Sequence, residues 1–136
     1  MLKNILIAAI MVSASAISNA AFVEVGKDRN MIVLADTNTV EADRNGNVRM
    51  VFKIIFSAPK DQADIDLGEK VAALFRQDTY NCYNGTGRID RATWVGVTNR
   101  TKTFTNPNSG FDKIQPNSVW QDMYKTVCES YLRHIK

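Results

Sequence analysis

The sequence is poor in the residues on which most catalytic and metal sites depend. Its 136 residues include one histidine, His134 close to the C-terminus, and only two cysteines. Zinc sites use cysteine and histidine in sets of three or four. The chain also contains no phosphate loop, dinucleotide fingerprint, G-x-S-x-G elbow or H-E-x-x-H motif. We therefore predict no metal, no cofactor and no catalytic residue, although a pair of acids that converge only in the fold would still allow a hydrolase.

Neither sign of charge dominates the composition. The chain has 17 basic and 14 acidic side chains, a net charge of +3, which falls to +2 without Lys3. So small an excess predicts neither nucleic-acid binding nor general attraction to a membrane surface. The sequence also has no internal repeat and no apolar run of the roughly twenty residues that a membrane span requires.

The first twenty residues have the layout of a secretory signal peptide. A short basic start is followed by an apolar run of eight residues, Ile5 to Val12, and then by small residues that end at Ala20. We expect cleavage after Ala20, with a second possible site after Ala16. The apolar run is too short for a membrane-spanning helix, and no cysteine near the cleavage site provides a lipid attachment point. We therefore predict a signal peptide over residues 1–20 and one exported domain over 21–136.

The mature chain begins as a series of short strands. Alternation or apolar runs predict strands at residues 22–25, 31–35 and 47–56, with a few more extended residues near 41–44. Asn45-Gly46 favours a tight hairpin turn. In the strand at 47–56, Val48, Met50, Phe52, Ile54 and Phe56 share one fully apolar face. The opposite face is mixed, and its Val51 and Ile55 suggest a surface for a second copy of the chain.

Further strands are predicted at residues 70–83, 88–97 and 101–105, after a loop at 57–69. In the first of these, Arg76 and Asp78 share a parity with Leu74 and Tyr80. A flat strand would bury this charged pair, so we expect a break or bulge there.

The end of the chain predicts an amphipathic helix. Ser118 and Gln121 form a capping-box pattern, and apolar residues then recur at three- and four-residue steps, which places them on one broad stripe. The predicted fold is therefore α+β: an antiparallel sheet of about six strands, with one C-terminal helix packed on one face.

The two cysteines join these parts of the prediction. Cys82 falls at the end of a strand and Cys128 on the flank of the helical stripe. In an oxidising compartment the two would form a disulfide that ties the helix to the sheet. Two buried free thiols and a bond between chains are the alternatives that stay open on the sequence alone.

One segment is basic enough to suggest a binding surface. Arg88, Arg91, Arg100 and Lys102 lie within fifteen residues, with Trp94 between them and only Asp90 opposing. Arginine and tryptophan are frequent anchors of protein interfaces, so these five residues are our candidate partner-binding set. The alternative is an ordinary edge strand whose charges prevent sheet-to-sheet aggregation.

Several motifs together resemble the surface-adhesin protein E family of Gram-negative bacteria. They are Val33-Leu-Ala-Asp-Thr37, Asn45-Gly46 before the strand at 48–56, Asp78-Thr-Tyr-Asn-Cys82 with Arg88 downstream, and Ile114-Gln-Pro-Asn-Ser118 leading to Val127-Cys128. The resemblance covers most of the mature chain. It implies an antiparallel sheet carrying a disulfide-fixed C-terminal helix, and a non-enzymatic domain that binds host matrix or plasma proteins and can form a homodimer. The sequence departs from the family in having Phe22 where tryptophan is expected, and in lacking a lipidation cysteine.

These observations lead to two functional hypotheses. The first is an exported, non-enzymatic binding module with a protein partner, located in the periplasm or at the cell surface. The second is a periplasmic inhibitor or envelope-stress module that acts on a bacterial partner.

Overall fold

A computed structural model describes residues 22–62, 65–105 and 110–134; the predicted signal peptide lies outside them. The strands are β1 (Phe22–Lys27), β2 (Met31–Ala42), β3 (Asn47–Lys60), β4 (Val71–Asn81), β5 (Thr86–Gly96), β6 (Thr101–Thr105) and β7 (Asp112–Lys113). The helix α2 (Val119–His134) follows them.

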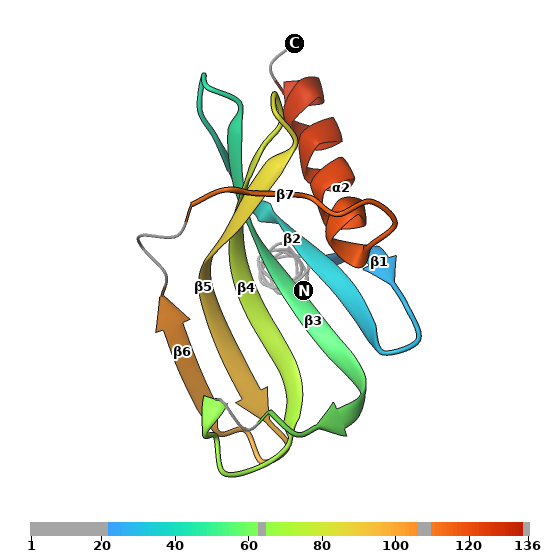
Figure 1. The fold of residues 1–136 in the computed structure, drawn as a ribbon, viewed down its shortest axis with the longest axis vertical. Coiled ribbons are helices and arrows are strands. Elements are labelled where there is room, and N and C mark those ends of the chain that lie inside the picture. Colours follow the sequence, from blue (N-terminus) through green and yellow to red (C-terminus); the bar gives the residue numbers. More distant parts are fainter. Residues whose placement is uncertain (1–21, 63–64, 106–109, 135–136) are drawn as a thin grey trace, which may run out of the picture.

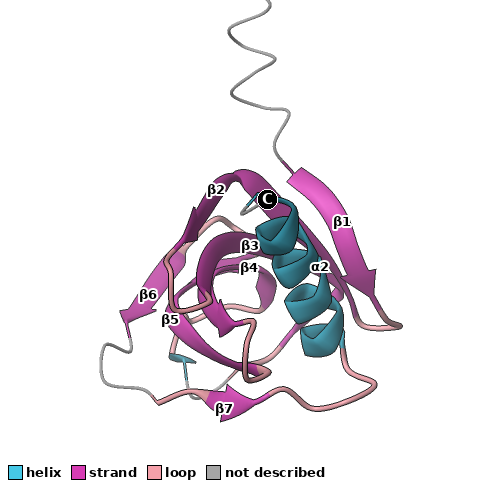
Figure 2. Ribbon diagram, turned by 90° about the horizontal axis from the view of Figure 1, so that it is seen from above, coloured by secondary structure: helices cyan, strands magenta, loops and turns pink. Residues whose placement is uncertain are grey.

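The strands form one antiparallel sheet in sequence order, from β1 to β6. β7 pairs with the first residues of β5, while β6 pairs with the second half of β5. Figure 1 shows α2 in front of β1 and β2, and Figure 2 shows the sheet curving around the helix. The predicted α+β fold, an antiparallel sheet of about six strands with one C-terminal helix on one face, is confirmed.

The alternation in β3 separates two faces of the sheet. Val48, Met50, Phe52 and Ile54 are between 0 and 4% exposed and face α2. We call this side the helix face and the opposite side the outer face. The outward residues of β3 are half-buried or exposed. The mixed side of this strand, which the sequence identified, is therefore the outer face.

The C-terminal helix begins and packs as its sequence predicts. The Ser118 hydroxyl accepts a hydrogen bond from the N–H of Gln121 at 3.2 Å, which satisfies one of the free donors at the helix start. The side chain of Gln121 accepts from the N–H of Asn117 at 3.1 Å. Met123 and Val127 are buried against the sheet.

The disulfide between Cys82 and Cys128 is present, with the two Cα atoms 5.5 Å apart. It joins the residue after β4 to the middle of α2. Gly87 permits close packing at the same end of the sheet, because a Cβ there would lie 2.7 Å from the Tyr80 ring. Tyr80 can therefore pack in the core between β5 and the ring of Tyr124, whose centroid is 6.1 Å away.

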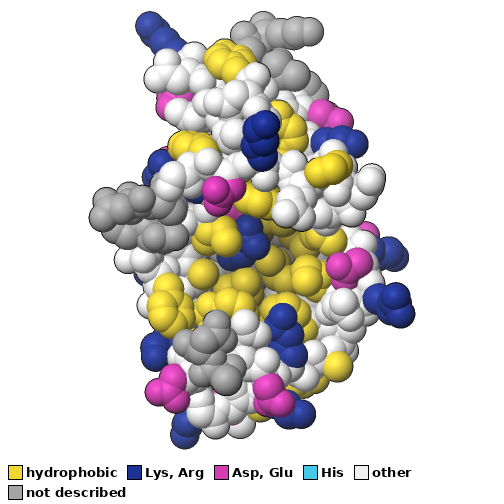
Figure 3. All heavy atoms as spheres, viewed as in Figure 1, with side chains coloured by type: hydrophobic (Ala, Val, Ile, Leu, Met, Phe, Trp, Pro, Cys, Tyr) yellow, Lys and Arg dark blue, Asp and Glu magenta, His cyan; other side chains and the backbone are white. Residues whose placement is uncertain are grey.

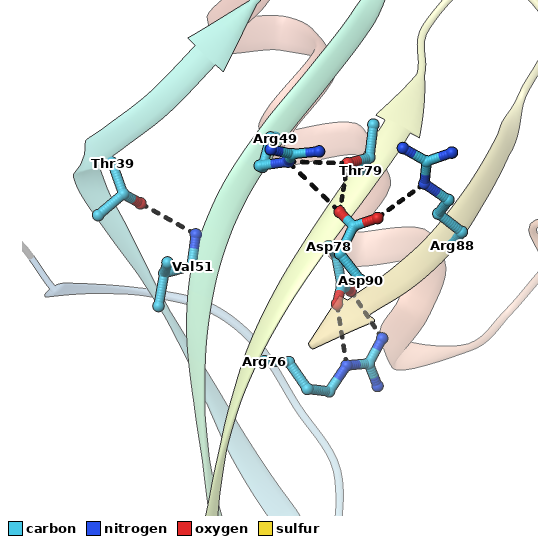
Figure 4. Close-up of polar contacts among 8 residues, drawn as sticks. All are labelled: Thr39, Arg49, Val51, Arg76, Asp78, Thr79, Arg88 and Asp90. Carbon is cyan, nitrogen blue, oxygen red and sulfur yellow. Dashed lines mark hydrogen bonds and ion pairs between the residues drawn. The ribbon is translucent and has the colours of Figure 1, made fainter. Parts of the chain in front are cut away.

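Three parts of the chain differ from the prediction. β2 continues through the residues expected to form a turn, with an irregularity between Asp36 and Glu41. There the Thr39 hydroxyl accepts a hydrogen bond from the N–H of Val51 at 2.9 Å and replaces a backbone partner (Figure 4). β3 extends to Lys60, although residues 57–60 were predicted to be loop, and β7 was not predicted.

Of the break or bulge expected at Arg76 and Asp78, only a bulge in the pairing with the neighbouring strand β5 is present, and the charged pair is buried all the same. β4 pairs continuously with β3 through both residues, and both side chains lie on the helix face. The bulge is instead in β5, where Gln77 pairs with Arg91 but Asp78 pairs with Ile89. A continuous strand can bury the charged pair because the two side chains neutralise each other.

Candidate binding surface

The five predicted partner-binding residues do not form one cluster. Strand register places Arg88 and Arg91 on the outer face, opposite Thr79 and Gln77. Trp94 and Lys102 are paired with each other on the helix face. Arg100 lies in the turn between β5 and β6. The short sequence span that contains the five residues is therefore divided between two faces and a turn.

Trp94 is packed rather than fully exposed. Its ring lies nearly parallel to that of Phe56, with centroids 6.5 Å apart. It also packs against a small buried cluster of Ile65, Leu67 and Val71. These contacts show that at least part of its surface belongs to the core.

Arg100 is held at the turn by an acid. Its Nε lies 3.6 Å from Glu69, although 66% of its side chain is exposed. Glu69 also accepts hydrogen bonds from the hydroxyl and the N–H of Thr98, which lower the pKa of its carboxyl. Because the Arg100 side chain is largely exposed, screening by water limits what the pair contributes to stability.

On the outer face, two arginines from different strands share one carboxylate. Arg88 Nε donates to Asp90 Oδ1 at 2.7 Å, and Arg49 Nε lies 3.4 Å from Asp90 Oδ2. The Thr79 hydroxyl also donates to Asp90, at 2.5 Å. Figure 4 shows these groups converging from β3, β4 and β5. We call this set, Arg49, Thr79, Arg88 and Asp90, the arginine cluster.

The bulge in β5 explains how Asp90 reaches this position. Arg88 pairs with Thr79 and Arg91 with Gln77, so one extra residue is accommodated between them. A bulge of this kind redirects side chains. The contacts of Asp90 place its carboxylate on the outer face, the same side as Arg88 and Arg91.

The arginine cluster leaves donor groups free. Both arginines contact Asp90 through Nε, and within the described residues their terminal Nη atoms have no hydrogen-bond partner. The side chains are 40% exposed for Arg49 and 29% for Arg88. The Arg88 guanidinium also lies 4.6 Å from the centre of the Phe111 ring, which supports it by a cation–π contact.

A shallow depression of about 290 Å³ adjoins the arginine cluster. Its remaining lining comes from the β2–β3 hairpin and from the residue before β7: Glu41, Ala42, Asp43, Asn47 and Phe111. Arginine termini can bind a carboxylate in a bidentate manner, and an aromatic wall can pack against an apolar group. The free termini of Arg49 and Arg88 are the groups that could bind an acidic side chain there, beside the two acids of the same depression, Glu41 and Asp43.

The sequence did not identify Arg49 as part of this site. Its place on the mixed face of the strand at 47–56 was visible, but its proximity to Arg88 depends on the register across β3, β4 and β5. Residues 39 positions apart can be brought together only by that pairing. The available signal was that Arg49 is a basic residue on the outward-facing side of the strand that follows the hairpin turn.

A second charged group is buried on the helix face. Arg76 donates to Asp78 through Nε at 3.1 Å and Nη2 at 2.6 Å, and the Tyr80 hydroxyl donates to the same carboxylate at 2.7 Å. Asp78 is fully buried. Burial acts to lower the pKa of Arg76, but the charge of Asp78 and its hydrogen bonds outweigh this effect and raise the pKa above its usual value. Burial, reinforced by the charge of Asp78, raises the pKa of Tyr80.

The outer face also carries an apolar row. Ile32, Ile55, Ala73 and Val95 are paired in sequence across β2, β3, β4 and β5. Ile32 and Ile55 are 38 and 36% exposed. This row includes one of the two residues that suggested a surface for a second copy.

Two further features are absent from the part of the chain that the structure describes. No helix there is long and apolar enough to cross a membrane. Residues 22–62, 65–105 and 110–134 also contain no group of three or more histidine, cysteine or acidic side chains placed to hold a metal ion.

Comparison with known proteins gives a likeness of fold. No family model and no curated protein matches the sequence. Among solved structures, Haemophilus influenzae protein E superposes with a TM-score of 0.56 at 10% identity, over 85% of this chain and 89% of that one. A second crystal form gives 0.57 at 11% identity, over 83 and 91% of the two chains. Protein E from non-typeable H. influenzae gives 0.53 at 10% identity, over 85 and 80%. At this identity the similarity is one of fold.

Proposed function

We propose that this chain is an exported, non-enzymatic binding module of the surface-adhesin protein E type, with a protein as its partner. The observation that carries the proposal is the likeness to protein E over more than 80% of this chain. The disulfide-tied helix also agrees with what the sequence resemblance implies for that family. The candidate partners are host extracellular proteins, such as matrix or plasma proteins, and proteins of the periplasm.

The depression beside the arginine cluster is the proposed contact surface. Arg49 and Arg88 bring free guanidinium termini to one place, and the bulge sets Arg91 on the same face. Arginines that are already held in position lose little freedom on binding, which favours their use as anchors. We expect the partner to present an acidic side chain there. Trp94, Arg100 and Lys102, on the helix face and in the turn, would not contribute to the same contact.

The proposed location is the periplasm or the cell surface, after cleavage near Ala20. A disulfide that ties the last helix to the sheet suits an oxidising compartment. Treating intact cells with protease distinguishes the two locations, because it would degrade a surface protein and spare a periplasmic one. Recovery of the protein in the cytoplasm with residues 1–20 still attached would contradict export.

The alternative, a periplasmic inhibitor or envelope-stress module, differs in its partner. A pull-down with the mature protein would separate the two hypotheses. Capture of a purified matrix or plasma protein supports the adhesin-type function, while specific capture from periplasmic extract supports the alternative. Capture of neither would count against a protein-binding role.

A homodimer is a further part of the proposal. The exposed apolar row of Ile32 and Ile55 on the outer face is the surface that we expect a second copy to cover. Sedimentation of the mature protein should show a dimer that Ile55→Asp converts to monomer, because the substitution would bury a charge in the interface. A monomer at all concentrations would contradict this expectation.

A further inference from the structure

The helix face is only partly covered by α2. The helix packs mainly against β1, with further contacts to β2, β3 and β4. On the uncovered part of this face, Ile89 and Phe104 are 37 and 41% exposed, beside the half-buried Ala92. Figure 3 shows hydrophobic side chains gathered in a hollow on this face, around charged atoms. Exposed apolar patches of this kind frequently mark binding sites.

The side chain of Arg76 lies on the same surface as this hollow. Strand register places it next to Ala92, which is itself paired with Phe104. Two of its nitrogens are bound to Asp78, and its side chain is 16% exposed. In Figure 4 the third nitrogen, Nη1, points away from that carboxylate. Within the described part of the chain Nη1 has no hydrogen-bond partner, so its two N–H groups are free to bind an anion.

Folding stability alone does not require this arrangement. Replacing a buried ion pair by well-packed apolar residues of similar volume is often neutral or stabilising. A guanidinium fixed along one edge, with donors left on another, is instead suited to the recognition of a carboxylate. Asp78 and the Tyr80 hydroxyl hold Arg76 in position before any ligand binds, which reduces the entropy lost on binding.

The charged residues around the hollow are of both signs. On the helix face of β4, β5, β6 and β7 they are Arg76, Asp78, Lys102 and Asp112, and their formal charges sum to zero. The acidic Asp112 lies opposite Gly87, at the β7 end of this surface. The exposed Lys102 has its Nζ 5.6 Å from the centre of the Phe104 ring, at the edge of the apolar surface. An acidic group attached to an apolar body would therefore be recognised through the free donors of Arg76 and the exposed apolar side chains rather than through net charge.

We propose that this hollow binds an acidic side chain carried on an apolar segment of a protein partner, with Arg76 as the anchor for the carboxylate. Phe104, Ile89 and Ala92 would contact the apolar neighbours of that side chain. This second site is separate from the arginine cluster and lies on the other face of the sheet. It depends on the proposed function only in taking the partner to be a protein.

The test is a titration with defined peptides, followed through tryptophan fluorescence and calorimetry. The mature protein is titrated with a blocked peptide of alternating leucine and glutamate, and with the same peptide carrying glutamine. We expect saturable binding of the glutamate peptide, at least tenfold tighter than that of the glutamine peptide. Equal affinity for the two peptides, or no binding of either, would overturn the proposal.

Variants locate the binding. Phe104→Asp adds a repelling charge at an exposed position and should weaken the glutamate peptide at least tenfold. Val23→Asp, at a residue of β1 that is 50% exposed, is the matched control and should bind normally. Arg76→Met combined with Asp78→Leu removes the anchor without leaving a lone buried charge, and should abolish the preference for glutamate. Unchanged binding in either hollow variant would contradict the assignment. The two proposals can fail separately. If the peptide titration fails while a protein partner still binds in a way that depends on Arg49 and Arg88, the second site is wrong and the proposed function stands.

Discussion

At the scale of single residues, the buried group of Arg76, Asp78 and Tyr80 shows where sequence reasoning is limited. Parity correctly indicated that both charged residues would share the face of Leu74 and Tyr80. Parity does not tell whether the chain avoids burying these charges or buries them together with hydrogen-bond partners. Here the strand stays regular because one carboxylate accepts hydrogen bonds from both neighbours, and an acid so satisfied can be buried.

The first prediction concerns this pair. Asp78→Leu alone should lower the free energy of unfolding by about 3–5 kcal/mol, because it leaves the Arg76 charge buried without a partner. Adding Arg76→Met should restore part of that loss, since both charges are then gone while the buried Tyr80 hydroxyl still lacks its acceptor. Urea denaturation followed by circular dichroism measures both variants. A double variant as unstable as Asp78→Leu would show that packing rather than charge dominates.

The second prediction concerns alkaline pH. The pKa of Tyr80 is raised in the folded protein from its ordinary value of 10.0, mainly by burial. Above pH 10 the unfolded chain therefore loses this proton before the folded chain does, and the free energy of unfolding falls as pH rises. Below pH 10 the contribution of the protonated Tyr80 hydroxyl to stability is fully present. In Tyr80→Phe the free energy of unfolding should fall less steeply between pH 10 and 11 than in the unmodified protein. An identical fall in the two proteins would contradict the assignment of this pH dependence to Tyr80.

At the scale of elements, strands and helix were predictable where one face is buried. The alternation in β3 and the stripe of α2 follow directly from burial against each other. β2 was predicted too short because Thr39 supplies a side-chain hydrogen bond where backbone pairing is interrupted. β7 has only two residues and depends wholly on the edge of β5. The arginine cluster likewise depends on register, which no single segment encodes.

The third prediction concerns how α2 is held on the sheet. The bond between Cys82 and Cys128 closes a loop of 46 residues, for which the loop-entropy estimate is about 4 kcal/mol. That is a large part of the 5–15 kcal/mol usual for a domain. Replacing both cysteines by alanine should lower the unfolding free energy accordingly and speed hydrogen exchange in α2 more than in β3. Equal exchange in oxidised and substituted protein would contradict this role.

At the scale of the whole molecule, the fold presents two surfaces of different chemistry. The outer face has arginines held by Asp90 and an apolar row, while the helix face has a hollow around Arg76 beyond the reach of α2. The sequence predicted the basic character of residues 88–102 but could not divide them between faces. The β5 bulge and the turn at Arg100 make that division.

The central claim is that Arg49 and Arg88 anchor a protein partner on the outer face. The measurement that tests it most directly is the affinity of the captured partner for a variant in which both of these charges are reversed. In Arg49→Glu/Arg88→Glu, binding should weaken at least about thirtyfold, the loss expected for an interface anchor worth about 2 kcal/mol. Lys27→Glu/Lys125→Glu makes the same change in net charge at two exposed residues away from the depression, and should bind as the unmodified protein does. Circular dichroism checks that both variants keep the fold. Equal weakening in the two variants, or none in Arg49→Glu/Arg88→Glu, would contradict the account.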